Sequence, residues 1–185
     1  MNTRLFLVAP DAISEPHLIA CATAACAAGD CATILVTKSL LHQTIASLQA
    51  LNLAVILNDR EARDVHHSKA DGLLLSNIED FKTARESLKN ESLGFLAGVS
   101  RHAAMEAAEL GADFMCFNQT KQYAGEPIIA WWLDVTNIPA VALDAVTDAA
   151  FKPQNPEFIR PSDDMWTSPE AATETVKHLM AQWSA

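Results

Sequence analysis

An acidic turn follows one of the apolar runs of this 185-residue sequence, and its side chains could hold a metal ion. The run Ala54–Leu57 ends in Asn58-Asp59-Arg60, and Glu79 follows the next apolar run. Asp59 and Glu79 are hard oxygen donors, and Mg2+ held by one or two carboxylates plus a substrate phosphate would need little more. Asn58-Asp59 at the start of a helix would also make a good N-cap with a favourable charge. The acidic turn therefore predicts either a Mg2+ site or a helix cap.

A second candidate is the segment Gly98-Val99-Ser100-Arg101-His102, which ends an apolar run and opens a helical stretch. The free backbone N–H groups of a helix start can bind an anion, and His102 could transfer a proton there. Ser100 would also serve as an N-cap, although Ala103 stands where a capping box needs an acid. A histidine at a helix start is often structural or simply exposed, so both interpretations stay open.

Cationic and further polar side chains also follow apolar runs. Lys38 and Lys121 could contact a phosphate as point charges, or be ordinary solvated lysines. The other polar residues at such positions are Asn77, Asn118, Thr120, Asp144, Asp163 and Asp164.

Short apolar runs alternate with segments of helical spacing along the whole chain, which is typical of βα units around a parallel sheet. The expected strands are Leu5–Ala9, Thr33–Thr37, Ala54–Asn58, Gly72–Ser76, Gly94–Val99, Ala112–Phe117, Ala140–Leu143 and Glu157–Arg160. The expected helices are His17–Ala28, Leu40–Leu51, Glu61–Ser68, Ile78–Lys89, His102–Leu110, Pro127–Thr136 and Pro169–Trp183.

Eight βα repeats favour an α/β fold of the compact (β/α)8 TIM-barrel type over a flavodoxin-like open sheet of five or six strands. No linker or composition change divides the chain, so residues 1–185 are expected to form a single barrel domain. In such barrels the carboxyl ends of the strands carry the active site. The polar strand ends described above should therefore face one another across the barrel mouth.

Charge and composition limit the partners. The chain has 13 Lys and Arg against 23 Asp and Glu, a formal net charge of -10, and this excess would repel a phosphate backbone. We expect a small-molecule ligand and no nucleic acid. Exposed tryptophans at Trp131-Trp132 would be consistent with a homodimer.

Neither the cysteines nor the N-terminus indicates secretion. Cys21, Cys26 and Cys31 are five residues apart, which suits neither a zinc knuckle nor a redox pair, and with Cys116 they are interpreted as reduced packing residues. The apolar stretch before Pro10 is too short for a signal peptide. No run of about eighteen apolar residues predicts a membrane span. A cytoplasmic protein is expected.

Three stretches of the sequence resemble the thiamine-phosphate synthase and TenI family of barrels. Ala54–Arg60 is similar to the family segment that ends in Asn-Asp-Arg, and Ala70–Leu75 to the strand that follows it. Gly98–His102 and the later Gly111–Phe114 resemble the family's Gly-x-Ser-x-His helix and Gly-Ala-Asp-Tyr strand. Order and spacing agree throughout.

The resemblance implies roles for these residues in joining a pyrimidine pyrophosphate to a thiazole phosphate with Mg2+. Asp59 would take the first metal position, and Glu79 would stand at the second, where the family has Asp. Asn58 would contact the pyrophosphate and Ser100 the pyrimidine, while Thr120-Lys121 would lie near the phosphates. A tautomerase of this family would need a proton-transfer group, for which His102 is the candidate.

Several ligand positions of the family are changed in this sequence. Ile34–Lys38 stands where the family has Gln-x-Arg-x-Lys, and Leu74 replaces a histidine. Asp144-Ala145 replaces a Gly-Gly pair that binds the thiazole phosphate, and a carboxylate against a dianion costs several kcal/mol in a partly dry site. Two hypotheses follow. The first is a divergent, non-synthase member that binds another small metabolite, phosphorylated or not, at the barrel mouth, or that acts through partners. The second is an active thiamine-phosphate synthase.

Overall fold

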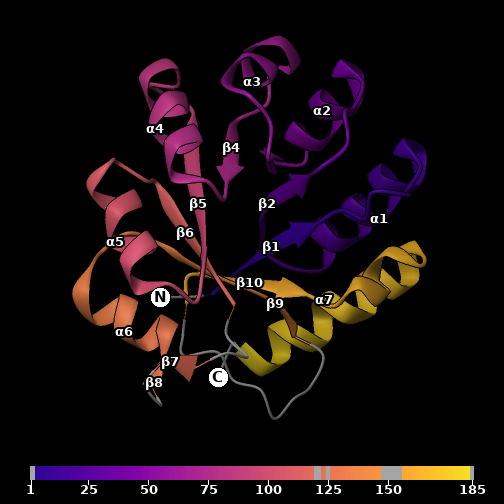
Figure 1. The fold of residues 1–185 in the computed structure, drawn as a ribbon. Coiled ribbons are helices and arrows are strands. Elements are labelled where there is room, and N and C mark those ends of the chain that lie inside the picture. The colour runs from indigo at the N-terminus through magenta and orange to yellow at the C-terminus, as the bar shows by residue number, and fades with distance from the viewer. Residues whose placement is uncertain (1–2, 119–121, 124–125, 147–155, 184–185) are drawn as a thin grey trace.

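The computed structural model describes residues 3–118, 122–123, 126–146 and 156–183. Eight parallel strands form a closed barrel in the order β1-β10-β9-β6-β5-β4-β3-β2 (Figure 1). The barrel strands are β1 (Arg4–Val8), β2 (Cys31–Val36), β3 (Ala54–Asn58), β4 (Gly72–Leu75), β5 (Ser92–Gly98), β6 (Phe114–Phe117), β9 (Ala140–Val146) and β10 (Phe158–Pro161). The predicted (β/α)8 barrel is confirmed.

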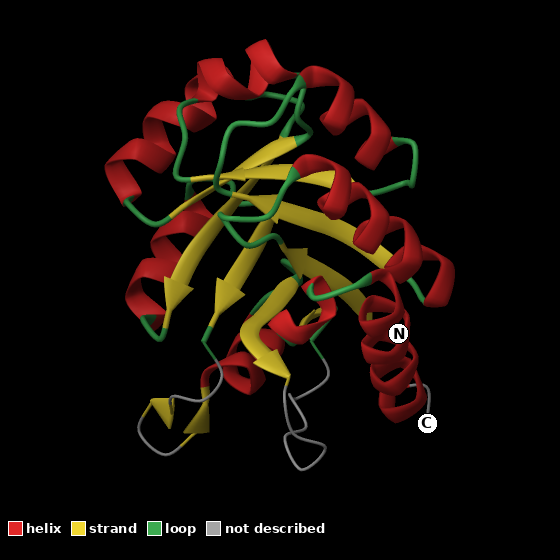
Figure 2. Ribbon diagram, turned by 90° about the vertical axis from the view of Figure 1, so that its right-hand side faces the viewer, coloured by secondary structure: helices red, strands yellow, loops and turns green. Residues whose placement is uncertain are grey.

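Helices surround this barrel on its outside (Figure 2). They are α1 (Glu15–Ala28), α2 (His42–Gln49), α3 (Ala62–Ser68), α4 (Ile78–Ser87), α5 (Arg101–Glu109), α6 (Ile128–Val135), α7 (Pro169–Trp183) and a 3-10 turn, η1 (Asp163–Trp166). A small antiparallel pair, β7 (Gln122–Tyr123) and β8 (Glu126–Pro127), precedes α6 and was not expected. Two-residue strands carry too little periodicity to be recognised in a sequence.

Two apolar clusters form because side chains of a strand alternate between its faces. An interior cluster fills the barrel with Phe6, Leu35, Ile56, Leu74, Phe114, Cys116 and Val141. A larger outer cluster joins the other strand faces to the helices. Gly94 belongs to this arrangement, because a Cβ there would overlap the Phe114 ring. The interior is thus a packed core, and a ligand can enter only at its ends.

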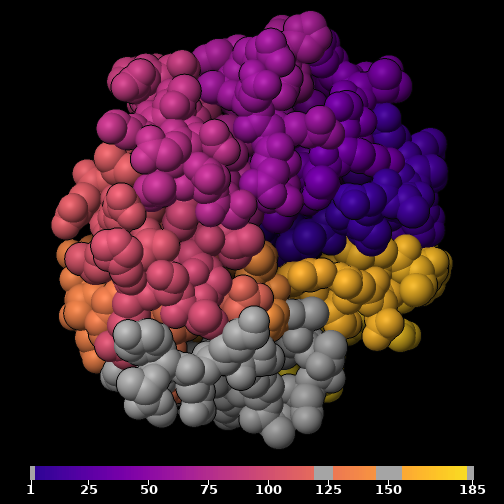
Figure 3. All heavy atoms as spheres, viewed as in Figure 1, coloured from indigo at the N-terminus to yellow at the C-terminus, as the bar shows by residue number. Residues whose placement is uncertain are grey.

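The first and last helices close the barrel against each other. Helix α7 packs on α1, and the indigo and yellow parts of the chain meet on one side of the molecule (Figure 3). A Cβ at Gly29, directly after α1, would overlap Val176 and Met180 of α7. The absence of a side chain at Gly29 therefore lets the two helices approach closely.

Two expectations about side chains have different outcomes. All four cysteines are free, and Cys21, Cys31 and Cys116 are buried, as expected of packing residues. Trp132, however, is fully buried and donates its indole N–H to the carbonyl of Ile138 at 2.9 Å, so its predicted exposure is wrong. The helix α6 turns one of two adjacent tryptophans into the core, because neighbours in a helix point about 100° apart.

Among the residues that the structure describes, no helix has the length and apolar character needed to cross a membrane. The homodimer stays a prediction, and its sequence argument now rests on the half-buried Trp131 alone. The Arg101 guanidinium lies 4.6 Å from the centre of that ring.

Candidate functional site

Strand alternation determines which side chains reach the barrel mouth. Ile56 belongs to the interior cluster and Leu57 to the outer one, so Asn58 returns to the interior side. The same counting brings further residues of the strand ends to the mouth: Thr37, Ser76, Gly98, Asn118 and Arg160. The mouth therefore carries short polar side chains and one guanidinium above an apolar floor.

The acidic turn after β3 has an unusual backbone. Asp59 adopts φ 46°, in the left-handed region that aspartate tolerates better than most residues. Its N–H donates to the carbonyl of Leu74 at 2.9 Å, and its carboxylate accepts a hydrogen bond of 3.3 Å from Ser76. This exposed carboxylate is therefore held at the end of β3 by β4 and the residue that follows it, and Asp59 does not cap α3.

Glu61 caps α3, the role that the sequence analysis considered for Asn58-Asp59. The Glu61 side chain caps the start of α3, and Asp64 accepts a hydrogen bond from the Glu61 N–H at 3.1 Å, which completes a capping box. Glu61 and Asp64 thus provide the cap of α3, and the carboxylate of Asp59 takes no part in capping this helix.

The second acidic position lies at the start of α4. Asn77 caps this helix by accepting hydrogen bonds from the N–H groups of Glu79 at 2.9 Å and Asp80 at 3.1 Å. The Glu79 side chain is exposed and does not line the cleft of about 570 Å3 between α3 and α4. Asp80 and Glu61 are the acids that share this cleft with Asp59. Sequence reasoning did not select Asp80, although it follows Glu79 directly.

A metal ion at this site would depend mainly on Asp59. No three histidine, cysteine or acidic side chains gather as a metal-binding group in the part of the chain that the structure describes. Mg2+ commonly takes one or two carboxylates, several waters and substrate phosphates, and needs no protein cage. The donors present therefore suit a Mg2+ ion that is bound together with a phosphate.

Lys38 lies outside the barrel mouth. Leu35 faces the interior and Val36 the outer cluster, so Lys38 falls on the outer side of the loop after β2. Its ammonium group donates a hydrogen bond to the carbonyl of Ile13. The inward residues of β2 are Thr33, Leu35 and Thr37, so the interior face of this strand carries neither an arginine nor a lysine.

The two candidates on α5 are placed differently from each other. Gly98 has φ 61°, and Ser100 caps the helix by accepting a hydrogen bond of 3.1 Å from the Ala103 N–H. The His102 side chain is 92% exposed, and its Nε2 lies 3.9 Å from a carboxylate oxygen of Glu106. The Ser100 hydroxyl is thus engaged as the cap of α5, whereas His102 points into solvent.

An amide and a carboxylate meet where β6 and β9 end. Asn118 donates a hydrogen bond of 2.9 Å from Nδ2 to Oδ1 of Asp144, and both side chains are half-buried. Thr120 and Lys121, expected near the phosphates, lie outside the described residues. The described part of this wall therefore carries a carboxylate that accepts a hydrogen bond from an amide.

Arg160 is the cation that sequence reasoning missed. Its Nη2 lies 2.7 Å from Asp163, its Nη1 donates to the Leu143 carbonyl at 3.4 Å, and its side chain is 23% exposed. Its buried Nε has no hydrogen-bond partner among the described residues. The alternation Phe158-Ile159-Arg160 could have placed it in the mouth, because it is the third residue of an alternating strand.

Together these groups can bind a small polar molecule. Arg160 supplies charge, Asn58, Ser76 and Asn118 supply neutral hydrogen-bonding groups, and Asp59 supplies a carboxylate at the rim. Beneath them, Leu35 and Leu74 form a dry apolar floor. Such a mixture of a few polar groups over apolar side chains is typical of small-molecule sites.

Curated proteins with similar sequences carry one name. A thiamine-phosphate synthase from Erythrobacter litoralis is 33% identical over 66% of this chain and 64% of its own length. A thiamine-phosphate synthase from Rhodospirillum centenum is 29% identical over 79% of each chain. The chain thus matches just under two thirds of the first relative. A search against models of protein families finds no match.

Solved structures show the same barrel. A thiamine phosphate pyrophosphorylase from Pyrococcus furiosus superposes with a TM-score of 0.72, 17% identity, and coverage of 98% of this chain and 95% of its own. An orotidine 5'-monophosphate decarboxylase from Methanocaldococcus jannaschii also reaches 0.72, at 12% identity over all of both chains. The barrel alone therefore does not select a function. The curated relatives and the confirmed barrel together show that this chain is similar to thiamine-phosphate synthases in sequence and in fold.

Proposed function

We propose that this protein is a divergent thiamine-phosphate synthase/TenI-like member that binds a small metabolite at the barrel mouth and has lost the synthase reaction. The observation that carries the proposal is the pair Asn118–Asp144, 2.9 Å apart, at the ends of β6 and β9. A half-buried carboxylate at this wall opposes a phosphate dianion, and such a like-charge contact costs several kcal/mol. The apolar inward face of β2 also supports it, because no guanidinium there can hold a pyrophosphate.

The second candidate is an active synthase that joins hydroxymethylpyrimidine pyrophosphate and thiazole phosphate. The exposed carboxylate of Asp59, held on a left-handed turn beside Ser76, favours it. In this alternative Asp59 would hold Mg2+, with Glu79 as the second acid. The ion would neutralise pyrophosphate as it leaves, Asn58 would orient that group, and Ser100 would contact the pyrimidine.

Incubation of the purified protein with both heterocycles and Mg2+ separates the two candidates. We expect no thiamine phosphate by chromatography and no rise in Tm with either phosphorylated heterocycle. Turnover that disappears in Asp59→Asn but survives in the surface control Asp134→Asn would establish the synthase and refute the divergent function.

A gain of binding tests the electrostatic argument directly. Replacing Asp144 by Asn removes the charge and keeps a side chain of the same size beside Asn118. We expect Asp144→Asn to bind thiazole phosphate at least about tenfold more tightly than the parent, because about 1.4 kcal/mol of repulsion is a factor of ten. Isothermal calorimetry measures this ratio. Equal affinities of parent and variant would show that Asp144 does not exclude the phosphate.

A further inference from the structure

A second hollow lies outside the barrel, between α2 and α3. It has a volume of about 650 Å3, within the range of small-molecule pockets. It exists because α3 is short and Val65 is its one described buried residue, so the two helices do not close over the outer face of the strands. Leu57, which lines the hollow, points away from the barrel interior, and this separates the hollow from the mouth.

Aliphatic side chains form the body of the cleft. Ile45 and Leu57 are 1% and 6% exposed and make its floor, while Leu40 and Leu41 form one wall. Leu41 is 68% exposed, more than the other exposed large hydrophobic residues that the structure describes. A ligand with an apolar body would remove this leucine from water, which is favourable.

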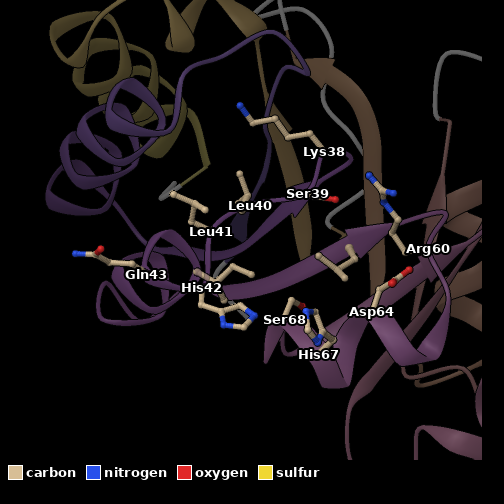
Figure 4. A pocket seen from close by; sticks show the side chains of 12 residues that line it. Lys38, Ser39, Leu40, Leu41, His42, Gln43, Arg60, Asp64, His67 and Ser68 are labelled. Carbon is tan, nitrogen blue, oxygen red and sulfur yellow. The ribbon is translucent and has the colours of Figure 1, made fainter.

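Basic and hydrogen-bonding side chains surround this apolar body. Arg60 lies at one end, where its Nε and Nη2 donate to the Thr37 carbonyl at 3.1 and 2.6 Å. Its Nη1 makes no hydrogen bond within the described residues. His42 and His67 lie beside each other, with ring centres 5.4 Å apart (Figure 4). Neither imidazole has a hydrogen bond to the described part of the chain, so both can donate to a ligand.

The charge balance of the cleft is opposite to that of the whole molecule. Lys38 and Arg60 are the cationic lining residues, and Asp64 is the one acid that lines it among the described residues. The Asp64 carboxylate already accepts the Glu61 N–H at 3.1 Å. In a chain of formal net charge -10, such a local excess of cations attracts an anion.

We propose that the α2–α3 cleft is a second small-molecule site, which binds an organic anion with an aromatic or aliphatic body. The apolar body lies on Ile45 and Leu57 against Leu41, and the anionic group accepts hydrogen bonds from Arg60, His42 or His67. This site is independent of the barrel mouth, so it stands whichever ligand the mouth binds.

A matched pair of fluorescent probes tests this assignment. 8-Anilinonaphthalene-1-sulfonate is an aromatic anion, and N-phenyl-1-naphthylamine is the same ring system without the sulfonate. Titration of the folded protein should show the anion binding at least fivefold more tightly than the neutral compound. No binding of the anion, or equal affinities, would overturn the proposal.

Surface variants locate the bound probe. Leu41→Glu should weaken the anion at least tenfold, whereas Met105→Glu, an equal change at another exposed apolar residue, should alter it less than twofold. His67→Ala should weaken the anion and leave the neutral probe unchanged, and its neighbour His66→Ala should affect neither. Thermal melts check that each variant is folded. Leu41→Glu and Met105→Glu with the same affinity would refute the site.

Discussion

Single residues decide what the barrel mouth can bind. Arg160 brings a guanidinium into a mouth whose interior strand faces are otherwise neutral or apolar in the described residues. Asp144 brings a carboxylate to the end of the neighbouring strand β9. Both are half-buried, where charge interactions are stronger than in bulk water. The choice of ligand at this mouth therefore depends on two side chains more than on the fold that it shares with other barrels.

The cysteines differ in reactivity because their surroundings differ. A hydrogen bond from the Cys31 thiol lowers the pKa of Cys26, whereas that bond and burial raise the pKa of Cys31. Burial also raises the pKa of Cys21 and of Cys116. The thiolate is the reactive form, so at neutral pH Cys26 should carry the largest reactive fraction.

Alkylation by iodoacetamide tests this order. In the native protein we expect Cys26 to be modified first, with a rate that rises as the pH increases towards its lowered pKa and then levels off. Mass spectrometry of digested samples identifies the modified residue. Cys26→Ser should remove the fast phase. Fast modification of Cys116 in the folded protein would contradict the protection that its burial should give.

At the scale of elements, acids at the amino ends of strands tie neighbouring strands together. Asp71, before β4, accepts the Val55 N–H at 2.8 Å, and Asp113, before β6, accepts the Leu93 N–H at 2.7 Å. Glu157 likewise accepts the Ala140 N–H at 2.8 Å. These acids lie at the face opposite the mouth, so the Ala-Asp motifs that resemble the family serve the barrel's stability.

Removal of Asp113 should destabilise the barrel without changing the mouth. Its Oδ2 accepts from the Leu93 N–H and from Arg85 Nη1 at 2.9 Å, and hydrogen bonds to a charged group contribute about 1.5–3 kcal/mol. We expect Asp113→Ala to lower the free energy of unfolding by about that amount in urea titrations. The exposed Asp134→Ala serves as control, and an equal effect of both changes would show that the strand tie contributes nothing.

For the whole molecule, the joint between the chain ends decides whether the barrel closes. Strand β1 pairs with β10 through Arg4 and Leu5, and α7 covers the adjoining part of α1. Val176 of α7 is fully buried against this joint. A closed barrel has no sheet edges, so a fault at the joint exposes two edges at once.

A charge at the joint should therefore unfold the protein as a whole. Burial of an unpaired carboxylate is among the few substitutions that cost more than about 4 kcal/mol. We expect Val176→Asp to abolish the cooperative thermal transition seen by circular dichroism, whereas the exposed neighbour Lys177→Asp should retain it. A cooperative melt of Val176→Asp near the parent Tm would show that α7 is dispensable for closure.

The sequence by itself determined the elements, because hydrophobic period and helix caps are local. It predicted all eight barrel strands within a few residues, including Ala54–Asn58 without error, and hence the barrel. It could not place side chains across the barrel, since a shift of one residue turns a side chain to the opposite face. Lys38 was therefore expected at the mouth that Arg160 occupies, and Trp132 was expected to be exposed. Contacts between elements that are distant in sequence create three further features, and only the tertiary structure decided them. These are the cleft that Asp80 shares with Asp59, the Asn118–Asp144 pair and the α2–α3 cleft.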